Sequence, residues 1–297
     1  EIIHNPEVND QIRAMGIVSI SPKPSDLELA GLRLNADDVV IIPAFGTEVS
    51  TRQRIESFGC QTVDTTCGDV MSVWKRAEAL AIFMEGKFAI AIAGTHGKTT
   101  TTSMLTVAFQ SLGLDPSFAI GGSIARGGTN AHFGSGNYFV AEADESDGSF
   151  LAYKPNGAVV TNIELDHVDN FPNIDAILDL FENFVASIKR GGFLVICIDG
   201  ENQRKLLDHV NRDDLKIISY GQKNADLTYS HLYLKPTGAM ARIVHGGKIL
   251  GELETSVPGE HNLLNALAVI GVGIATNQPV SELMNGIKNF TGARRRF

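Results

Sequence analysis

The stretch that most constrains the fold of this chain runs from Lys87 to Leu112. After Lys87 comes a nearly continuous apolar run, Phe88 to Ala93, which is typical of a buried strand. The run breaks at the sequence GTHGKT, residues 94–99, and apolar residues at helical spacing follow from Met104 onward. A strand, a glycine-containing turn and a helix in this order predict the phosphate cradle of a P-loop.

The residue types in this turn suit phosphate binding. Its glycines let backbone N–H groups approach phosphate oxygens, and the helix N-terminus adds partial positive charge. Lys98 can reach terminal phosphates, and the Thr99 hydroxyl can ligate Mg²⁺. The predicted nucleotide-binding residues are Gly94, Thr95, His96, Gly97, Lys98, Thr99 and Thr100. The general motif also needs a glycine where this chain has Ile92, so a glycine turn with a solvated lysine stays an alternative.

Composition limits the kinds of partner. The 297 residues are 43% hydrophobic and 20% charged, as in soluble globular proteins, and the length suggests about two domains. A net charge of −9 argues against a general nucleic-acid or anionic-membrane surface. No apolar run approaches a membrane span, and the polar N-terminus does not resemble a signal peptide, so we expect a cytoplasmic protein. The 3 cysteines are scattered and make no disulfide framework.

Acidic and polar side chains follow two later strands. The first group comes directly after the strand 138–141 and comprises Glu142, Asp144, Glu145 and Asp147. The second group follows the strand 157–161 and comprises Asn162, Glu164, Asp166 and His167. Because parallel strands bind ligands at their carboxyl ends, both groups are expected at the edge that carries the P-loop. Carboxylates beside a phosphate cradle predict a Mg²⁺ site. A solvated loop with capping aspartates is the alternative.

The remaining pattern predicts an α/β fold. A mostly parallel P-loop sheet is flanked by helices, of which 174–188, 203–210, 261–274 and 280–290 are the later ones. Short alternating runs between residues 232 and 250, separated by glycine-containing turns, predict a small antiparallel hairpin subregion. A smaller α/β segment with strands at 38–42 and 61–64 precedes this domain.

The first quarter of the chain resembles a second family. His4 and the following NPEVN, Phe45-Gly46, and the sequence DTTC ending at Cys67 are similar to 4-hydroxy-3-methylbut-2-enyl diphosphate reductase. The resemblance implies diphosphate contact by His4 and iron–sulfur ligation by Cys67. The other two cluster cysteines of that family have no counterpart here, and one thiolate cannot hold such a cluster alone. The sequence therefore argues against an iron–sulfur cluster and favours Cys67 as an ordinary thiol.

From about residue 76 onward the chain resembles the Mur ligases, on five motifs in family order. They are AIAGTHGKT at 91–99, AEADESD at 141–147, TNIELDH at 161–167, PGEHNLLNA at 258–266 and GARRRF at 292–297. The first motif is the family's own variant of the P-loop, which accounts for Ile92. Within this family, the sequences ADESDGSF and NIELDH most resemble those of the ligase that adds L-alanine.

The resemblance assigns roles to particular residues. It implies that Glu142 and His167, with Thr99 on the nucleotide side, hold Mg²⁺. It implies that Asn262 and Asn265 read adenine, although helix capping is an alternative. Lys98, Glu142 and His167 are the catalytic candidates. The implied reaction uses ATP to phosphorylate the carboxylate of UDP-N-acetylmuramate, and the amine of L-alanine then attacks the acyl phosphate.

Two domains are therefore predicted, a reductase-like segment at 1–76 and a Mur ligase ATP-binding domain at 77–297. A change of family inside one helix indicates a fusion or an engineered chimera. The family's other two domains have no counterpart here, so we expect nucleotide binding with little ligation. An iron–sulfur reductase and a non-catalytic nucleotide-binding module are the alternative functions. The sequence does not fix the oligomeric state.

Overall fold

The computed structural model describes residues 39–42, 61–64, 76–124, 129–146, 148–166 and 171–294. The chain divides into two compact units, Glu1–Phe83 and Met84–Phe297. Several residues singled out from the sequence, among them His4, Cys67, Asp147 and His167, lie outside the described ranges. In the ranges that are described, no helix combines the length and the apolar character needed to cross a membrane.

The described part of the first unit contains a parallel pair of strands. β1 (Val39–Ile42) lies beside β2 (Gln61–Asp64) with Val39 opposite Gln61. This confirms the strands predicted at 38–42 and 61–64. Helix α4 (Arg76–Met84) follows and ends just past the division between the units. The boundary predicted at residue 76 stays a prediction.

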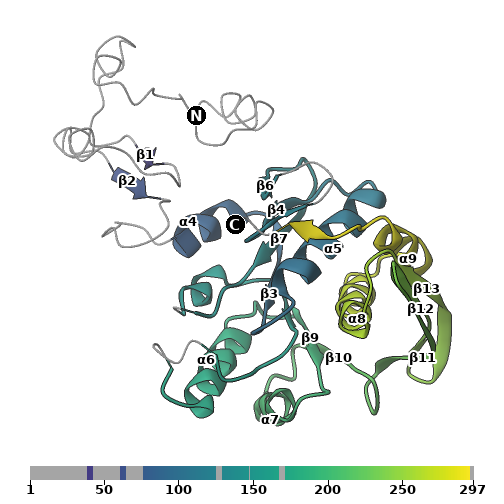
Figure 1. Cartoon of the computed structure of the whole chain (residues 1–297). Helices are drawn as coiled ribbons and strands as arrows, with labels where there is room; N and C mark the ends of the chain where they lie inside the picture. The colour runs from purple at the N-terminus through teal and green to yellow at the C-terminus, as the bar shows by residue number, and fades with distance from the viewer. Residues whose placement is uncertain are drawn as a thin grey trace. The chain divides into compact units, whose positions relative to one another are not determined.

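The second unit is built on a ten-stranded sheet in the order β13-β12-β11-β10-β9-β8-β3-β7-β4-β6 (Figure 1). Its seven central strands, from β11 to β4, are parallel. They are β3 (Phe88–Ala93), β4 (Ser117–Ala119), β7 (Tyr138–Glu142), β8 (Gly157–Val160), β9 (Phe193–Cys197), β10 (Lys216–Tyr220) and β11 (Leu227–Lys235). β3 lies between β7 and β8, so the two strands expected to carry polar side chains flank the P-loop strand.

Antiparallel strands complete both ends of the sheet. β12 (Gly238–His245) and β13 (Lys248–Thr255) form hairpins after β11, and β6 (Ala131–His132) pairs with β4. A separate two-stranded pair joins β5 (Ser123–Ile124) to β14 (Ala293–Arg294). The predicted hairpin subregion is confirmed, and its strands are longer than the short alternating runs indicated.

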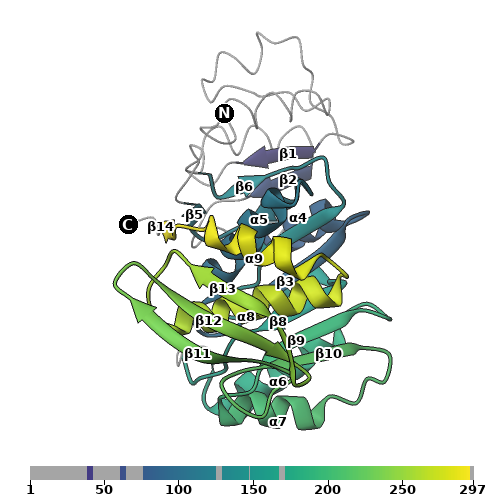
Figure 2. The same cartoon turned by 90° about the vertical axis from the view of Figure 1, so that its right-hand side faces the viewer.

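Helices cover both faces of the sheet (Figures 1 and 2). α5 (Lys98–Ser111), α8 (Glu260–Ala275) and α9 (Val280–Lys288) pack together on one face. α6 (Ile174–Ala186) and α7 (Glu201–His209) pack together on the other, and the 3₁₀ helix η1 (Ser149–Tyr153) contacts α6. The α/β prediction, a mostly parallel sheet flanked by helices, is therefore confirmed.

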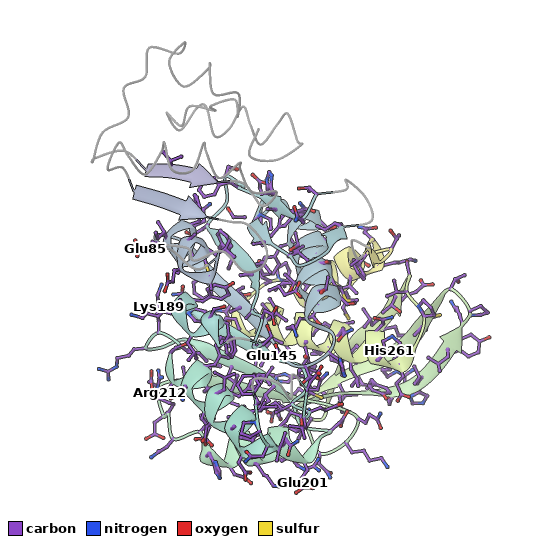
Figure 3. The ribbon with its side chains drawn as sticks, turned by 60° about the vertical axis from the view of Figure 1, so that its left-hand side comes forward. Glu85, Glu145, Lys189, Glu201, Arg212 and His261 are labelled. Carbon is purple, nitrogen blue, oxygen red and sulfur yellow. The ribbon has the colours of Figure 1, made fainter. Side chains whose placement is uncertain are left out.

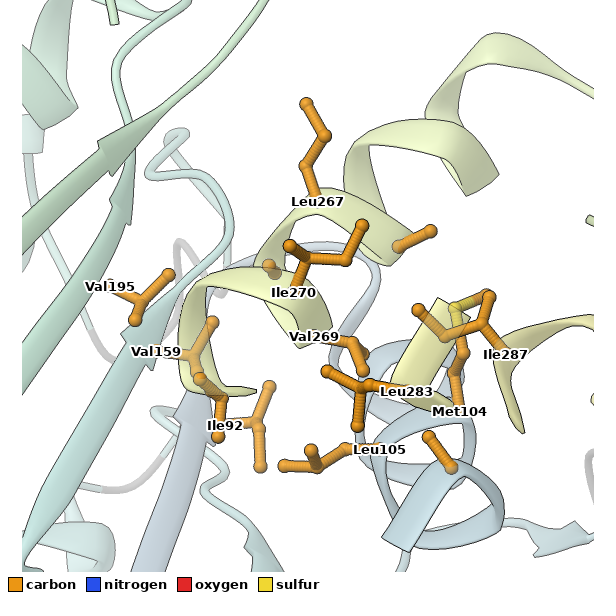
Figure 4. Packing of buried hydrophobic residues seen from close by; sticks show 14 of the residues in the cluster. Ile92, Met104, Leu105, Val159, Val195, Leu267, Val269, Ile270, Leu283 and Ile287 are labelled. Atoms are coloured by element: carbon orange, nitrogen blue, oxygen red, sulfur yellow. The ribbon is translucent and has the colours of Figure 1, made fainter. Parts of the chain in front are cut away.

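The core beneath α8 explains how the P-loop helix is held (Figure 4). Apolar side chains from three strands meet side chains from α5, α8 and α9, and those labelled in the figure are fully buried. They are Ile92, Val159 and Val195 from the sheet, Met104 and Leu105 from α5, Leu267, Val269 and Ile270 from α8, and Leu283 and Ile287 from α9. A fully buried aliphatic side chain of this size stabilises the fold by roughly 1.5–3 kcal/mol. This cluster fixes α5, and with it the loop that begins the helix.

Candidate nucleotide-binding site

The P-loop connects the end of β3 to the start of α5 through two glycines with positive φ angles. Gly94 has φ +132°, and a Cβ there would lie 2.1 Å from the Thr161 hydroxyl oxygen. Gly97 has φ +84°, and a Cβ there would lie 2.8 Å from Oδ1 of Asn265. Since L side chains rarely adopt such angles, both positions need glycine for two independent reasons.

The N-terminus of α5 is open toward this loop. Gly97 is the N-cap residue and makes no side-chain capping bond. The first backbone bond into the helix runs from the Thr101 N–H to the Gly97 carbonyl, 2.9 Å. Because the first N–H groups of a helix have no partner within it, Lys98, Thr99 and Thr100 present donors where the helix dipole is positive. These groups fit the phosphates of a nucleotide.

Lys98 is folded back into the cradle and is not the solvated lysine of the alternative interpretation. Its Nζ donates to the carbonyl oxygens of Gly94, 2.8 Å, and Thr95, 3.3 Å. It also forms an ion pair with Glu145, 2.9 Å from Nζ to Oε2, with the two side chains 13% and 4% exposed. Figure 3 shows Glu145 among the central elements, whereas Glu201 and Arg212 lie at the periphery. Burial raises the pKa of Glu145, and the nearby Lys98 charge opposes that shift.

Two of the three predicted metal ligands lie side by side. The Thr99 hydroxyl donates to Oε1 of Glu142, 2.8 Å, and the other carboxylate oxygen accepts from the Gly121 N–H, 2.6 Å. Among the described residues, no group of three or more His, Cys, Asp or Glu side chains could hold a metal ion. A hydroxyl and a carboxylate are oxygen ligands that Mg²⁺ accepts. The Thr99–Glu142 pair therefore fits one side of a Mg²⁺ site, and His167 lies outside the described ranges.

The segment after β8 runs along the other side of the loop. The Thr161 N–H donates to the Ala93 carbonyl, 3.0 Å, which continues the β3–β8 ladder to its end. Beyond it, the Glu164 N–H donates to the Thr95 hydroxyl, 2.9 Å. The exposed side chains of His96 and Glu164 approach to 3.8 Å at the rim. The end of β8 thus forms one wall of the cradle.

The first turns of α8 form another wall. The carboxamide of Asn265 is buried against Gly97 and donates to Oδ1 of Asn262, 3.3 Å. Asn262 in turn donates to the Pro258 carbonyl, 2.6 Å. The N-cap of α8 is Gly259, which makes no side-chain capping bond, so neither asparagine is the N-cap residue. Asn265 therefore lies against the P-loop and Asn262 is hydrogen-bonded to it, while the adenine-binding role of both residues stays a prediction.

A partly buried contact fixes the start of α8. The Tyr229 hydroxyl, from β11, donates to the carboxylate of Glu260, the first residue of the helix. Burial and this carboxylate raise the pKa of Tyr229. Nearby, Oδ1 of Asp199 accepts from the Gln222 N–H, 2.8 Å, and ties the ends of β9 and β10 together. The helix that carries Asn265 is thus anchored to the same sheet edge as the P-loop.

Sequence reasoning located this edge but missed several of its contacts. The expected meeting of Thr99 with Glu142 is found, and Asn265 does reach the loop. The ion pair between Lys98 and Glu145 was not predicted, because the acidic motif alone does not show which of its carboxylates points toward the P-loop lysine. Asp144 instead accepts from the Ser146 N–H, 3.1 Å, within the loop, and the N-cap residue of the following helix η1 is Gly148. Asp147 lies outside the described ranges.

Comparison with known families gives two matches. Residues 92–273 match the Mur ligase middle domain, and residues 1–112 match the LytB protein family, the reductase-like family of the first quarter. The two matches overlap between residues 92 and 112. The P-loop fold, the acidic edge and the longer of these matches place this chain in the Mur ligase family. The LytB match supports a second origin for its N-terminal segment.

Within that family the chain is similar to one kind of enzyme. A UDP-N-acetylmuramate–L-alanine ligase from Acidothermus cellulolyticus is 46% identical over 228 residues, which is 76% of this chain and 48% of that protein. The enzyme of the same name from Mycolicibacterium smegmatis is 39% identical over 97% of this chain and 60% of its own length. The chain spans about half the length of the curated relatives it matches.

Solved structures show the same fold. A UDP-N-acetylmuramate-alanine ligase from Thermotoga maritima matches with a TM-score of 0.67 and 26% identity, covering 99% of this chain and 63% of that one. A UDP-N-acetylmuramate:L-alanyl-gamma-D-glutamyl-meso-diaminopimelate ligase from Neisseria meningitides matches with a TM-score of 0.70 and 23% identity, covering 99% of this chain and 90% of that one. The likeness to the second structure shows the fold alone.

Proposed function

We propose that this chain carries the ATP-binding core of a carboxylate–amine ligase of peptidoglycan precursor synthesis. Its substrates are UDP-N-acetylmuramate and L-alanine, and its place is the cytoplasm. The observation that carries the proposal is the meeting of the P-loop with the Thr99–Glu142 pair, 2.8 Å between their oxygens. A phosphate cradle beside oxygen ligands is what ATP with Mg²⁺ requires.

The residues of this chain have distinct parts in the proposal. The first-turn N–H groups of α5 bind phosphate, Lys98 neutralises phosphate charge, and Thr99 with Glu142 holds Mg²⁺. Asn265, buried against Gly97, orients the adenine. ATP supplies the phosphoryl group that turns the acceptor carboxylate into an acyl phosphate, which the alanine amine then attacks.

The first test is ATP binding by calorimetry in the presence of Mg²⁺. Lys98→Ala is expected to weaken binding by about 10–100-fold, the value of a charge-assisted hydrogen bond. Lys205→Ala is the matched control, because Lys205 is an exposed lysine that pairs with Glu201 on α7. Unchanged ATP affinity in Lys98→Ala would defeat the P-loop assignment.

The Lys98 variant also leaves Glu145 buried without its cation, which is costly to the fold. The double variant Lys98→Met with Glu145→Gln removes both charges, and it separates loss of binding from loss of folding. The substrate class is tested by phosphate release. Release that depends on both UDP-N-acetylmuramate and L-alanine supports the proposal, and release that neither stimulates argues against these substrates.

A further inference from the structure

One side chain of the wall formed by the end of β8 both accepts a hydrogen bond from the P-loop backbone and donates one to it. The His96 N–H donates to Oδ1 of Asn162, 2.7 Å, and Nδ2 of Asn162 donates to the His96 carbonyl, 3.0 Å. The carboxamide thus acts as a β-ladder partner, because a hydrogen-bonded antiparallel pair also exchanges both groups. It does so beyond the end of the β3–β8 ladder, past the backbone bond from the Thr161 N–H to the Ala93 carbonyl.

Neighbouring contacts hold the same peptide. The Thr161 hydroxyl donates to the His96 carbonyl, 2.6 Å, and the Thr95 N–H donates to the Asn162 carbonyl, 3.1 Å. The close approach is possible because Gly94 has no Cβ, which would lie 2.9 Å from both the N and the O of Asn162. The loop and the end of β8 therefore fit each other over consecutive residues.

This pairing sits directly before the phosphate-binding groups. The His96 carbonyl belongs to the peptide whose N–H is that of Gly97, the N-cap residue of α5. Fixing the carbonyl on the side of Asn162 turns this N–H the opposite way, since the two point in opposite directions across a trans peptide. On its other side, Gly97 lies so close to Asn265 that a Cβ on the glycine would be 2.8 Å from Oδ1 of the asparagine. The orientation of the peptide is thus set from two walls.

We propose that Asn162 is a positioning residue for phosphate binding. Its carboxamide holds the His96–Gly97 peptide in the orientation that lets the Gly97 N–H face the nucleotide phosphates. This inference rests on the proposed function, because it assigns a role within the same nucleotide site. Asn162 acts through the backbone and contributes to affinity for the phosphates rather than for the adenosine.

The test compares ATP and adenosine binding by calorimetry in wild type, Asn162→Ala and Asn162→Asp. Asn162→Ala is expected to weaken ATP binding about tenfold, the value of one to two backbone hydrogen bonds, and to leave adenosine affinity unchanged. Asn162→Asp keeps the acceptor for the His96 N–H but turns a carboxylate oxygen toward the His96 carbonyl and adds negative charge. It is expected to bind ATP more weakly than Asn162→Ala.

Asn156→Ala is the matched control. Oδ1 of Asn156 accepts from the Ala89 N–H, 3.0 Å, so it ties the same two strands together at the opposite end of β8. This variant is expected to lower the melting temperature and to leave ATP affinity unchanged. Equal losses of ATP affinity in the Asn156 and Asn162 variants would assign Asn162 a structural role and overturn the proposal.

The outcomes separate the two proposals. Wild type that binds no ATP contradicts the proposed function itself. Wild type that binds ATP, with Asn162→Ala binding it equally well, contradicts only the positioning role. Parallel losses of ATP and adenosine affinity also contradict that role, because they would place Asn162 against the nucleoside.

Discussion

Replacing Gly94 with alanine tests whether the P-loop is held as tightly as its contacts indicate. The residue has φ +132°, a conformation that only glycine adopts readily, and forcing alanine into it costs about 1–3 kcal/mol. The new Cβ would also lie 2.1 Å from the Thr161 hydroxyl oxygen and 2.9 Å from two backbone atoms of Asn162. Overpacking of this kind costs about 1–3 kcal/mol. The variant is therefore expected to lose about 2–6 kcal/mol of unfolding free energy.

The matched control is Gly113→Ala, after the end of α5. Gly113 also has a positive φ, +73°, but a Cβ at this position would have no atom within 4 Å. It should lose about 1–2 kcal/mol from backbone strain alone. Urea unfolding followed by circular dichroism gives both values, provided that the denaturant slopes agree.

A double variant assigns the excess to a contact. Thr161→Ala removes the closest atom, so Gly94→Ala should cost less in the Thr161→Ala background than in wild type, with a coupling of about 0.5–3 kcal/mol. The backbone atoms of Asn162 remain, and part of the loss should persist. If Gly94→Ala costs no more than Gly113→Ala, the close approach of the two walls is refuted.

Two further changes test the acidic side of the site. Glu142→Gln should raise the Mg²⁺ concentration needed for half-maximal ATP binding about tenfold and leave ATP binding in EDTA unchanged; an unaltered Mg²⁺ requirement would remove Glu142 from the metal site. Burial raises the pKa of Glu145 above its usual value of 4.5, so this group binds more protons in the folded protein than in the unfolded chain. Wild type therefore loses stability as the pH rises from 4.5 through the raised pKa of the folded state. The unfolding free energy of Glu145→Gln should therefore rise relative to wild type as pH increases from about 4, whereas a falling difference would show that the Lys98 charge outweighs burial.

The sheet was predictable because its strands are nearly continuous apolar runs. The run Phe88–Ala93 could only be a buried strand before a glycine turn, and the structure has β3 at these residues. Short elements carried too little pattern to be found. β4, Ser117–Ala119, and β6, Ala131–His132, span too few residues to show a period, and tertiary pairing alone defines them.

The site was predictable to the level of the edge but not of the contact. Strand ends placed Glu142 and Asn162 near the P-loop, since parallel strands share a carboxyl edge. Which side chain meets which group depends on the loop conformations after those ends. Lys98 pairs with Glu145, and the His96 peptide pairs with Asn162. Both pairings depend on the backbone conformation of the loops, which cannot be derived from the residue types in these motifs.

The contact between Gly97 and Asn265 has a consequence for synthesis of the chain on the ribosome. The two residues stand more than half of the sequence apart, yet the side chain of Asn265 packs directly against Gly97 in the loop. The strand, the loop and α5 emerge from the ribosome long before α8, so the nascent chain displays the apolar surface that α8 later covers. Under the proposed function, nucleotide therefore acts as a folding ligand only at a late stage, when α8 has docked and the binding-competent state exists.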